Sequence, residues 1–330
     1  MTSRAANLPA KPSVWVLTEG QAGTENQARG LAEAMGFEPE IKRLRPRPFW
    51  RHLPPRLWPR PLRAQDPAGD PLVPPWPDLL ISSGKRATAP SVAIRKASGG
   101  RTVTAHVQDP RWPASAFDLL FVPAHDRLRG PNVVVTRTAL HRVTRVTLDA
   151  AAAAFAPRLE ALPRPRVAVL IGGSNRRHKT SEAAFERLAD QLAQLCREAG
   201  AGLLVTPSRR TGARNEAILR RRLAGLPAEI WDGSGENPYF GYLGLADFVI
   251  VSRDSVSMVS EACASGRPIY TARLASNSRR LDVFHRVLED AGVTRPFEGR
   301  LETWPYDPPD DTAKAAAAVL AHLAARAHSG

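Results

Sequence analysis

Short apolar runs alternate along the chain with stretches in which apolar residues recur every three or four positions. In the first half, runs typical of strands lie at 13–18, 79–82, 102–107, 119–122 and 132–135, and a helical pattern lies at 26–35. In the second half, strand patterns at 167–171, 202–206, 248–251 and 268–271 alternate with helical patterns at 181–198, 215–223, 256–264 and 282–291. This alternation predicts an α/β fold with two parallel-sheet domains.

The two blocks of strands and helices are separated by a proline-rich stretch. Residues 156–166 read APRLEALPRPR, a composition typical of a linker. We therefore expect an N-terminal domain at 1–155, a linker at 156–166 and a C-terminal domain at 167–310. The remaining residues, 311–330, are rich in alanine and are predicted to form a final helix that packs back on the N-terminal domain.

Ligands of parallel sheets bind outside the carboxyl ends of the strands, so the loops that follow the strands are the candidate sites. In the first block, the loop at 18–27 contains two glycines and two amides, and later loops contain acids and a histidine. The candidates in this block are Gly20, Gly23, Asn26 and Gln27 in the first loop, and Asp109, His125 and Asp126 in the later loops.

In the second block, glycines, hydroxyls and arginines follow successive strands. Glycines and cations beside the start of a helix are typical of an anion site, although a solvated loop and a plain helix cap are the simpler interpretations of the same residues. The candidates are Gly172, Gly173, Ser174, Arg209, Arg210, Asn237, Ser255, Ser257 and Glu261. Ser257 and Glu261 lie four residues apart and so share a face of a helix.

Composition restricts the function further. The 330 residues carry a formal net charge of +14, yet 40 of the 46 basic residues are arginine, a bias that also follows from coding composition. No nucleic-acid-binding motif, metal-ligand spacing, secretory signal or membrane-spanning run is present, so we expect no nucleic acid partner and no metal. Two widely spaced cysteines, Cys196 and Cys263, are expected to be reduced core thiols of a cytoplasmic protein.

One local cluster of positive charge could bind an anionic partner. Residues 41–65 hold eight Lys and Arg, no acidic residue, six prolines and the aromatics Phe49, Trp50 and Trp58. The stretch is either a solvated surface loop or a patch that binds anionic lipid or phosphate with its aromatics as interfacial anchors. The second interpretation predicts a peripheral location at the inner face of the membrane.

Several sequence blocks, in order along 14–290, resemble the mitochondrial fission ELM (elongated mitochondria) family: LTEGQAGTENQARGLAEAMG, SGKRATAP, QDPR, HDRLRGPNV, ALHRVT, IGGSNRRHK, TPSRRT, GENPYFGYLGLAD and SRDSVSMVSEA. Glu19, Gln21 and Thr24 depart from the family's usual first loop. The family is similar to GT-B glycosyltransferases, which implies two Rossmann-like domains facing across a cleft, with the nucleotide sugar held by the C-terminal domain.

By that resemblance Glu261 would accept from the ribose hydroxyls, Ser255 and Ser257 would donate to phosphate, and Arg209 and Arg210 with the Gly172–Ser174 backbone would neutralise the diphosphate. The expected activity is that of an inverting, metal-independent glycosyltransferase. Its general base would belong to the N-terminal domain, with Asp109, His125 and Asp126 as the candidates. The enzyme would need no cofactor besides the nucleotide-diphosphate sugar that serves as donor substrate. Two alternatives stay open, a non-catalytic recruitment scaffold of the fission-factor type and a nucleotide-sugar epimerase.

Overall fold

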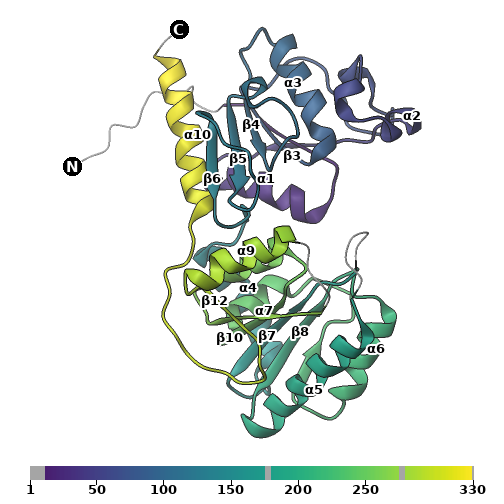
Figure 1. Cartoon of the computed structure of the whole chain (residues 1–330), viewed down its shortest axis with the longest axis vertical. Helices are drawn as coiled ribbons and strands as arrows, with labels where there is room; N and C mark the ends of the chain where they lie inside the picture. The colour runs from purple at the N-terminus through teal and green to yellow at the C-terminus, as the bar shows by residue number, and fades with distance from the viewer. Residues whose placement is uncertain (1–11, 175–179, 275–278, 329–330) are drawn as a thin grey trace, which may run out of the picture. The chain divides into compact units, whose positions relative to one another are not determined.

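The computed structural model describes residues 12–174, 180–274 and 279–328 (Figure 1). The chain divides into two compact units, Met1–Arg142 together with Asp310–Gly330, and Val143–Pro309. Each unit is built around one six-stranded sheet in which every neighbouring pair of strands is parallel. The predicted α/β class with two parallel sheets is therefore confirmed.

The sheet of the first unit has the order β2-β1-β3-β4-β5-β6. Its strands are β1 (Val14–Thr18), β2 (Glu40–Arg43), β3 (Leu79–Ser83), β4 (Val103–Val107), β5 (Leu119–Pro123) and β6 (Val133–Thr136). Its helices are α1 (Ala22–Ala34), α2 (Pro48–His52), α3 (Thr88–Ala97) and α10 (Asp311–Ala327), with short 3-10 turns η1 (Pro55–Leu57), η2 (Pro61–Arg63), η3 (Lys85–Ala87) and η4 (Ala114–Ala116).

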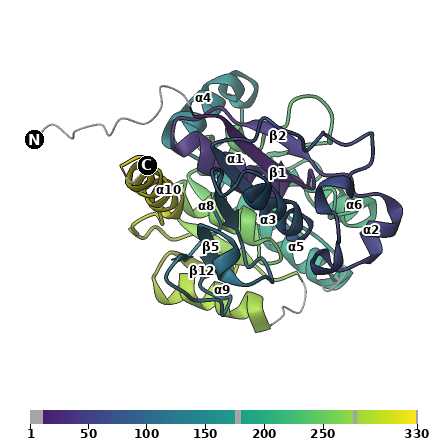
Figure 2. The same ribbon diagram turned by 90° about the horizontal axis from the view of Figure 1, so that it is seen from above.

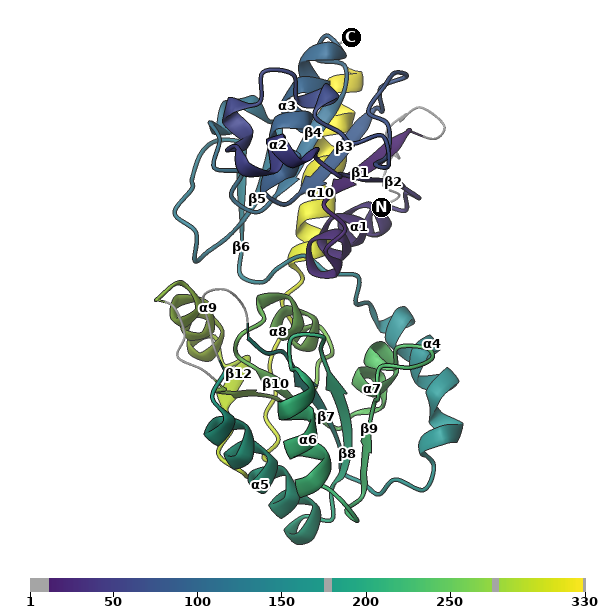
Figure 3. The ribbon, with the colours of Figure 1, turned by 90° about the vertical axis from the view of Figure 1, so that its right-hand side faces the viewer.

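Both faces of this sheet are covered, which explains why its strands are almost continuously apolar. In β1, Val14 and Val16 pack with α1 and α10, whereas Trp15 and Leu17 pack on the opposite face with Ile94 of α3. Figure 3 shows the strands between α3 and α10. Figure 2 shows the short helix α2 on the side of this unit away from α10.

The sheet of the second unit has the order β12-β11-β10-β7-β8-β9. Its strands are β7 (Arg166–Ile171), β8 (Gly202–Pro207), β9 (Ala228–Ile230), β10 (Phe248–Ser252), β11 (Ile269–Ala272) and β12 (Thr294–Pro296). Its helices are α4 (Arg145–Phe155), α5 (Glu182–Glu198), α6 (Ala213–Arg222), α7 (Tyr239–Leu245), α8 (Val256–Cys263) and α9 (Arg279–Asp290), with the 3-10 turn η5 (Ala156–Leu159). Chain order reverses between β7 and β10, as in a doubly wound dinucleotide-binding sheet.

Here too the helices form a layer on each side of the sheet. Helices α5 and α6 pack on one face around Val167, Val169 and Ile171, and α4, α7 and α8 pack on the other around Ala168 and Leu170. Figure 3 shows these two helical layers on either side of β7 and β8. The free thiols of Cys196 and Cys263 are buried in this unit, as predicted.

The observed division of the chain differs from the expected boundaries. Helix α4 and the proline-rich residues 156–166 belong to the second unit, because Phe155 and Leu159 pack against Leu204 and Tyr242. The chain passes between the units at Arg142–Val143 and again at Pro309–Asp310. Among the described residues, no helix combines the length and the apolarity needed to cross a membrane.

The final helix is part of the first unit, where it packs against α1. Its first residue, Asp311, is buried, and one carboxylate oxygen accepts from Arg137 N at 3.0 Å and from Thr138 N and Oγ1 at 2.8 Å each. The preceding residue, Asp310, only caps the helix by accepting from Ala313 N at 3.2 Å. Two adjacent aspartates thus have different structural roles.

We expect Asp311→Ala to lower the free energy of unfolding by about 3 kcal/mol, because it leaves two backbone donors without their charged acceptor. Asp310→Ala removes one exposed cap and should cost about 1 kcal/mol. Urea denaturation followed by tryptophan fluorescence measures both variants against the parent. Equal losses in the two variants would contradict the role assigned to Asp311.

Candidate functional site

The candidate site of the second unit lies at the carboxyl ends of β7, β8 and β10, where the chain order of the sheet reverses. The loop after β7 supplies Gly172, Gly173 and Ser174, the loop after β8 supplies Arg209 and Arg210, and α8 follows β10. The structure therefore gathers these predicted residues at one edge of one sheet, the position at which such sheets bind nucleotides. Residues 175–179, which supply the cations of the sequence block IGGSNRRHK, lie outside the described residues.

The carboxylate of Asp254 joins the three loops. Its Oδ2 accepts from Gly173 N at 3.0 Å and pairs with Arg210 Nη1 at 2.8 Å. The Arg210 guanidinium also donates to Gly173 O at 3.1 Å. The Asp254 side chain is only 4% exposed, and its Oδ1 has no hydrogen-bond partner in the part of the chain described.

This arrangement requires the two glycines. A Cβ on Gly172 would lie 2.2 Å from Asp254 Oδ2, and one on Gly173 would lie 2.0 Å from Arg210 O. Any larger residue would push the loop off the carboxylate. The sequence-based interpretation, that these glycines permit a close backbone approach, is correct, but the approaching group is the protein's own.

The predicted phosphate role of the Gly172–Ser174 backbone needs correction. The amides of these three residues all donate within the protein, Gly172 N to Ser252 Oγ at 2.7 Å, Gly173 N to Asp254, and Ser174 N to Arg210 O at 3.1 Å. Since each amide already has an acceptor, this backbone shapes the loop and does not present donors to a ligand. Ser174 Oγ likewise accepts from Thr180 N at 3.1 Å.

The two neighbouring arginines have different environments. Arg210 is held by Asp254 and Gly173, so its charge is neutralised at close range. Arg209 is exposed and makes no ion pair or side-chain hydrogen bond with any residue that the structure describes. Of the predicted pair, Arg209 is the cation free to meet an anionic ligand, and Arg210 orients the loop.

Helix α8 begins at the same edge of the sheet. Its N-cap is Ser255, whose Oγ accepts from Met258 N at 3.4 Å, so Asp254 is not the cap. The segment before it is fixed by Arg253, which pairs with Glu289 Oε1 at 2.5 Å and whose carbonyl accepts from the buried His285 Nε2 at 2.8 Å. Burial lowers the pKa of His285 to about 4, so its ring is neutral and its Nε2–H donates.

Glu261 lies on α8, one turn beyond Ser257, and is 7% exposed. One carboxylate oxygen accepts from the hydroxyl of Tyr239, at the start of α7, at 2.7 Å. Burial raises the pKa of Glu261 to about 7, and the hydrogen bond from Tyr239 opposes this shift. Asn237 lies next to this pair, because its Oδ1 accepts from Tyr239 N at 3.0 Å.

The predicted residues of the first unit fall into two groups. Helix α1 begins at Ala22, earlier than predicted, so Gly23, Asn26 and Gln27 lie on the helix and only Gly20 remains in the loop. The loop interpretation is therefore wrong for Gly23, whereas Asn26 and Gln27 already lay within the helical pattern predicted at 26–35. Gln27 is buried and accepts from Gln108 Nε2 at 3.2 Å.

The base candidates lie in the loops after β4 and β5. Asp109 accepts from Arg111 N at 2.8 Å and pairs with Arg111 Nε at 3.2 Å. Asp126 is buried, and its neighbour His125 is half-buried, in the turn that follows β5. All three lie at the carboxyl edge of the first sheet, and the choice of base among them stays a prediction.

A polar cavity of about 510 Å³ lies at the point of the first sheet where chain order reverses between β1 and β3. An ion pair between Glu19 Oε2 and Arg86 Nη1, 2.7 Å long, forms part of its wall, and Arg86 N also donates to Glu19 Oε1 at 3.2 Å. Glu19 departs from the expected family loop, and this pairing gives it a structural partner.

Three residues of these sites were not predicted from the sequence: Asp254 as the link between loops, Tyr239 as the partner of Glu261, and Glu19 as the partner of Arg86. An acidic residue directly after a buried strand and a tyrosine after an Asn-Pro turn were visible signals. Their partners lie far away along the chain, however, so only the fold could identify them.

The chain matches one family of known proteins along most of its length. The family model described as Mitochondrial fission ELM1 matches residues 22–323. The "Mitochondrial fission protein ELM1" of Arabidopsis thaliana is 30% identical over 280 residues, which are 77% of this chain and 65% of the relative, so the chain spans less than two thirds of that protein. The "Uncharacterized protein RP120" of Rickettsia prowazekii is 24% identical over 278 residues, 73% of this chain and 78% of the relative.

Among solved structures, the UDP-GlcNAc 2-epimerase of Methanocaldococcus jannaschii superposes with a TM-score of 0.58 at 11% identity, covering 94% of this chain and 99% of that one. The glycotransferase of kitacinnamycin gives a TM-score of 0.53 at 14% identity, covering 98% and 97%. At such identities the likeness concerns the fold alone, and it confirms the predicted GT-B-like architecture.

We expect the ionisation of Glu261 to make stability depend on pH. The pKa of Glu261 is higher in the folded protein than in the unfolded chain, so between these two values the folded protein holds a proton that the unfolded chain releases. The stabilisation that comes from the bound proton is complete below about pH 4.5 and is lost as the pH rises through about 7. Between those values, the parent should lose about 2–3 kcal/mol of unfolding free energy relative to Glu261→Gln. Denaturation curves of both proteins across this pH range measure the difference, and parallel pH profiles would contradict the raised pKa.

Proposed function

This chain belongs to the mitochondrial fission ELM1 family, and we propose that its second unit binds a nucleotide-diphosphate sugar and that the protein transfers the sugar to an acceptor. The reaction would be inverting and independent of metal. The observation that carries the proposal is the buried Glu261, on the helix that follows the strand at the reversal point of the second sheet.

Glu261 has the properties that a ribose-binding residue needs. A buried carboxylate that already accepts one hydroxyl hydrogen bond, from Tyr239, can accept further ones from vicinal hydroxyls. Because the pKa of this carboxyl is about 7, such hydrogen bonds would favour its ionised form. We therefore expect nucleotide affinity to increase as the pH rises through neutrality.

The diphosphate would lie at the N-terminus of α8 with Arg209. Helix N-termini favour anions, and Ser255 is the N-cap of this helix while Ser257 lies in its first turn. Arg209 supplies a charge that no described residue neutralises, while Arg210 and Asp254 keep the adjacent loop in place. In the transfer step these positive groups would stabilise the negative charge that develops on the leaving diphosphate.

The proton of the acceptor hydroxyl would be taken by a base as that oxygen attacks the anomeric carbon and the bond to the diphosphate breaks. By the family resemblance this base is supplied by the first unit, from Asp109, His125 or Asp126. A uridine nucleotide is the first donor to test, because the similar solved structures include enzymes named for UDP-GlcNAc.

Two alternatives lead to different results. An epimerase would convert the sugar nucleotide to its epimer without an acceptor, and the epimerase titles among the similar structures are the reason to test it. A recruitment scaffold is suggested by the fission protein of Arabidopsis. A scaffold would neither release nucleoside diphosphate nor form an epimer.

We also propose that the protein associates with anionic membrane surfaces through residues 41–65. Phe49 is 69% exposed and Leu57 is 62% exposed, whereas Trp58 is 5% exposed and Trp50 is half-buried. The sequence-based assignment of Trp58 as an interfacial anchor is therefore wrong, because it packs with Ala64 and Ala89. Phe49 and Leu57 are the apolar side chains available to a membrane.

A panel of nucleoside diphosphate sugars should raise the melting temperature, and one member should do so most. A ligand at a hundred times its dissociation constant adds about 2.7 kcal/mol to the unfolding free energy. Glu261→Gln should weaken binding by about tenfold to a hundredfold, since it removes charged hydrogen bonds to ribose. Arg209→Ala should weaken binding of the diphosphate but hardly affect the nucleoside.

Matched variants at exposed positions, Glu160→Gln and Arg197→Ala, should bind like the parent. If no sugar nucleotide shifts the melting temperature of the parent, the transferase and the epimerase are both rejected. If binding occurs, release of nucleoside diphosphate with an acceptor extract identifies a transferase, and a new epimer without one identifies the epimerase.

Vesicle sedimentation tests the membrane proposal. Binding should require anionic lipid and weaken at high salt. The double variant Arg60→Ser/Arg63→Ser should bind about tenfold or more weakly, at roughly 1 kcal/mol for each charge. Arg197→Ser/Arg300→Ser removes the same charge from exposed positions of the second unit and should bind like the parent. Equal binding of neutral and anionic vesicles would reject the proposal.

A further inference from the structure

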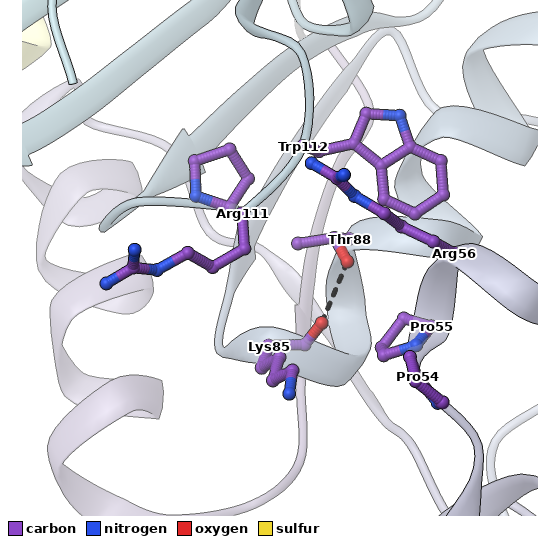
Figure 4. Close-up of a pocket in the computed structure, with 8 residues that line it drawn as sticks. Pro54, Pro55, Arg56, Lys85, Thr88, Arg111 and Trp112 are labelled. Atoms are coloured by element: carbon purple, nitrogen blue, oxygen red, sulfur yellow. Dashed lines mark hydrogen bonds between the residues drawn. The ribbon is translucent and has the colours of Figure 1, made fainter.

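The first unit contains a second cavity, of about 380 Å³, next to the turn that follows β3 (Figure 4). Three segments form its wall: the proline-rich stretch, the η3 turn with the start of α3, and the loop after β4. The lining residues are Pro54, Pro55, Arg56, Lys85, Thr88, Pro110, Arg111 and Trp112. Five of these residues, from Lys85 to Trp112, lie outside the stretch 41–65 that is proposed to contact membranes.

Three cations and no carboxylate line this cavity. The ammonium group of Lys85 makes no ion pair or hydrogen bond with any described residue. The guanidinium of Arg56 lies 5.8 Å from the centre of the Trp112 ring and has no acidic partner within the same part of the chain. Arg111 is paired through its Nε with Asp109, which lies outside the wall, at 3.2 Å.

Prolines and tight turns restrict the backbone of this wall. Pro54 and Pro55 precede Arg56, and Arg111 lies between Pro110 and, two residues further on, Pro113. The loop after β4 keeps two non-glycine residues at positive φ, Gln108 at 83° and Arg111 at 55°. The hydroxyl of Thr88 donates to Lys85 O at 2.8 Å and fixes the turn that carries the lysine, as Figure 4 shows.

Unneutralised cations in a preformed cavity call for an anion with several acceptor oxygens. A cavity of this volume has room for a small molecule and not merely for a single ion. We propose that it binds a phosphate monoester. The favoured source is the headgroup of a phospholipid, because Leu57, next to Arg56, and Phe49 in the same stretch are exposed apolar side chains.

The proposed monoester site belongs to the first unit and does not depend on sugar-nucleotide binding by the second. The assignment of a phospholipid as the source rests on the proposed membrane association, in which the basic residues of 41–65 attract any anionic surface. The cavity adds selectivity for a type of phosphate. Two pairs of basic residues separate these effects: Arg56 and Lys85 line the cavity, whereas Arg60 and Arg63 lie outside its wall.

The first arm of the experiment uses a soluble ligand. Calorimetric titration with glycerol 3-phosphate, a monoester, should show binding to the full-length protein, and glycerophosphocholine, a diester, should bind much more weakly. Arg56→Ser/Lys85→Ser should lower the affinity for the monoester by about tenfold or more. Arg60→Ser/Arg63→Ser, with the same loss of charge, should leave it unchanged. Circular dichroism melts show whether both variants are folded.

The second arm uses phosphatidylcholine vesicles that contain either phosphatidic acid, a monoester, or phosphatidylglycerol, a diester, at matched surface potential. The parent should prefer phosphatidic acid, Arg56→Ser/Lys85→Ser should lose the preference, and Arg60→Ser/Arg63→Ser should keep it while binding both vesicles more weakly. Cavity-dependent binding of glycerol 3-phosphate without a vesicle preference would support the monoester site and reject the lipid source. No monoester binding, or equal losses in both double variants, would overturn the proposal.

Discussion

The carboxylate of Asp254 lies where a side chain on Gly172 would be, and the functional edge of the second unit is organised around it. It accepts from the loop after β7 and pairs with Arg210 from the loop after β8, while its own residue follows β10. A buried carboxylate is costly unless it is paired, so the position of one loop restricts the other two. Positions 172 and 173 must therefore be glycine, and the backbone amides of this loop donate to acceptors within the protein. The loop therefore acts as a support, and among the described residues at this edge Arg209 and the start of α8 are the groups placed to meet an anionic ligand.

Ion pairs also connect strand ends in the first unit, but among its described residues no single carboxylate joins several loops in the way that Asp254 does in the second. Glu19 after β1 pairs with Arg86 after β3, and Glu25 on α1 forms two hydrogen bonds, of 3.1 and 2.9 Å, with the guanidinium of Arg43 at the end of β2. These pairs join neighbouring strand ends without a shared central acid. Glu19 pairs with Arg86, whereas the adjacent Lys85 makes no ion pair with a described residue and lines the cavity beside Arg56. One short turn thus supplies both a structural ion pair and a cation of that cavity.

How much of the structure can be predicted from the sequence depends on how far apart along the chain the interacting residues lie. The core strands and α5 and α10 were predictable because their periodicity is local, whereas the edge strands β2, β9 and β12, of three or four residues, carry too little pattern. Helix α4 was missed because its run of alanines has no polar face, and α3 because it begins in a turn with proline. The residues of the candidate site were predictable as types at strand ends. Their pairing was not, since Asp254 reaches Gly173 only through the parallel pairing of β7 and β10.

The net charge of +14 is distributed in a way that supports two anion sites. On the surface formed by α5 and α6, arginines face acids, as in Arg214 with Glu182, Arg221 with Glu186 and Arg222 with Asp190. At the carboxyl edges of the sheets, by contrast, Arg209, Lys85 and Arg56 have no acidic partner among the described residues. Exposed ion pairs on helices contribute little to stability, so the pairing there mainly limits the excess charge of that face. The uncompensated cations instead belong to loops that tight turns, prolines or a buried carboxylate hold in place. A charge that is held but not neutralised is available to a ligand, and both units keep such charges at the edge where parallel sheets bind ligands.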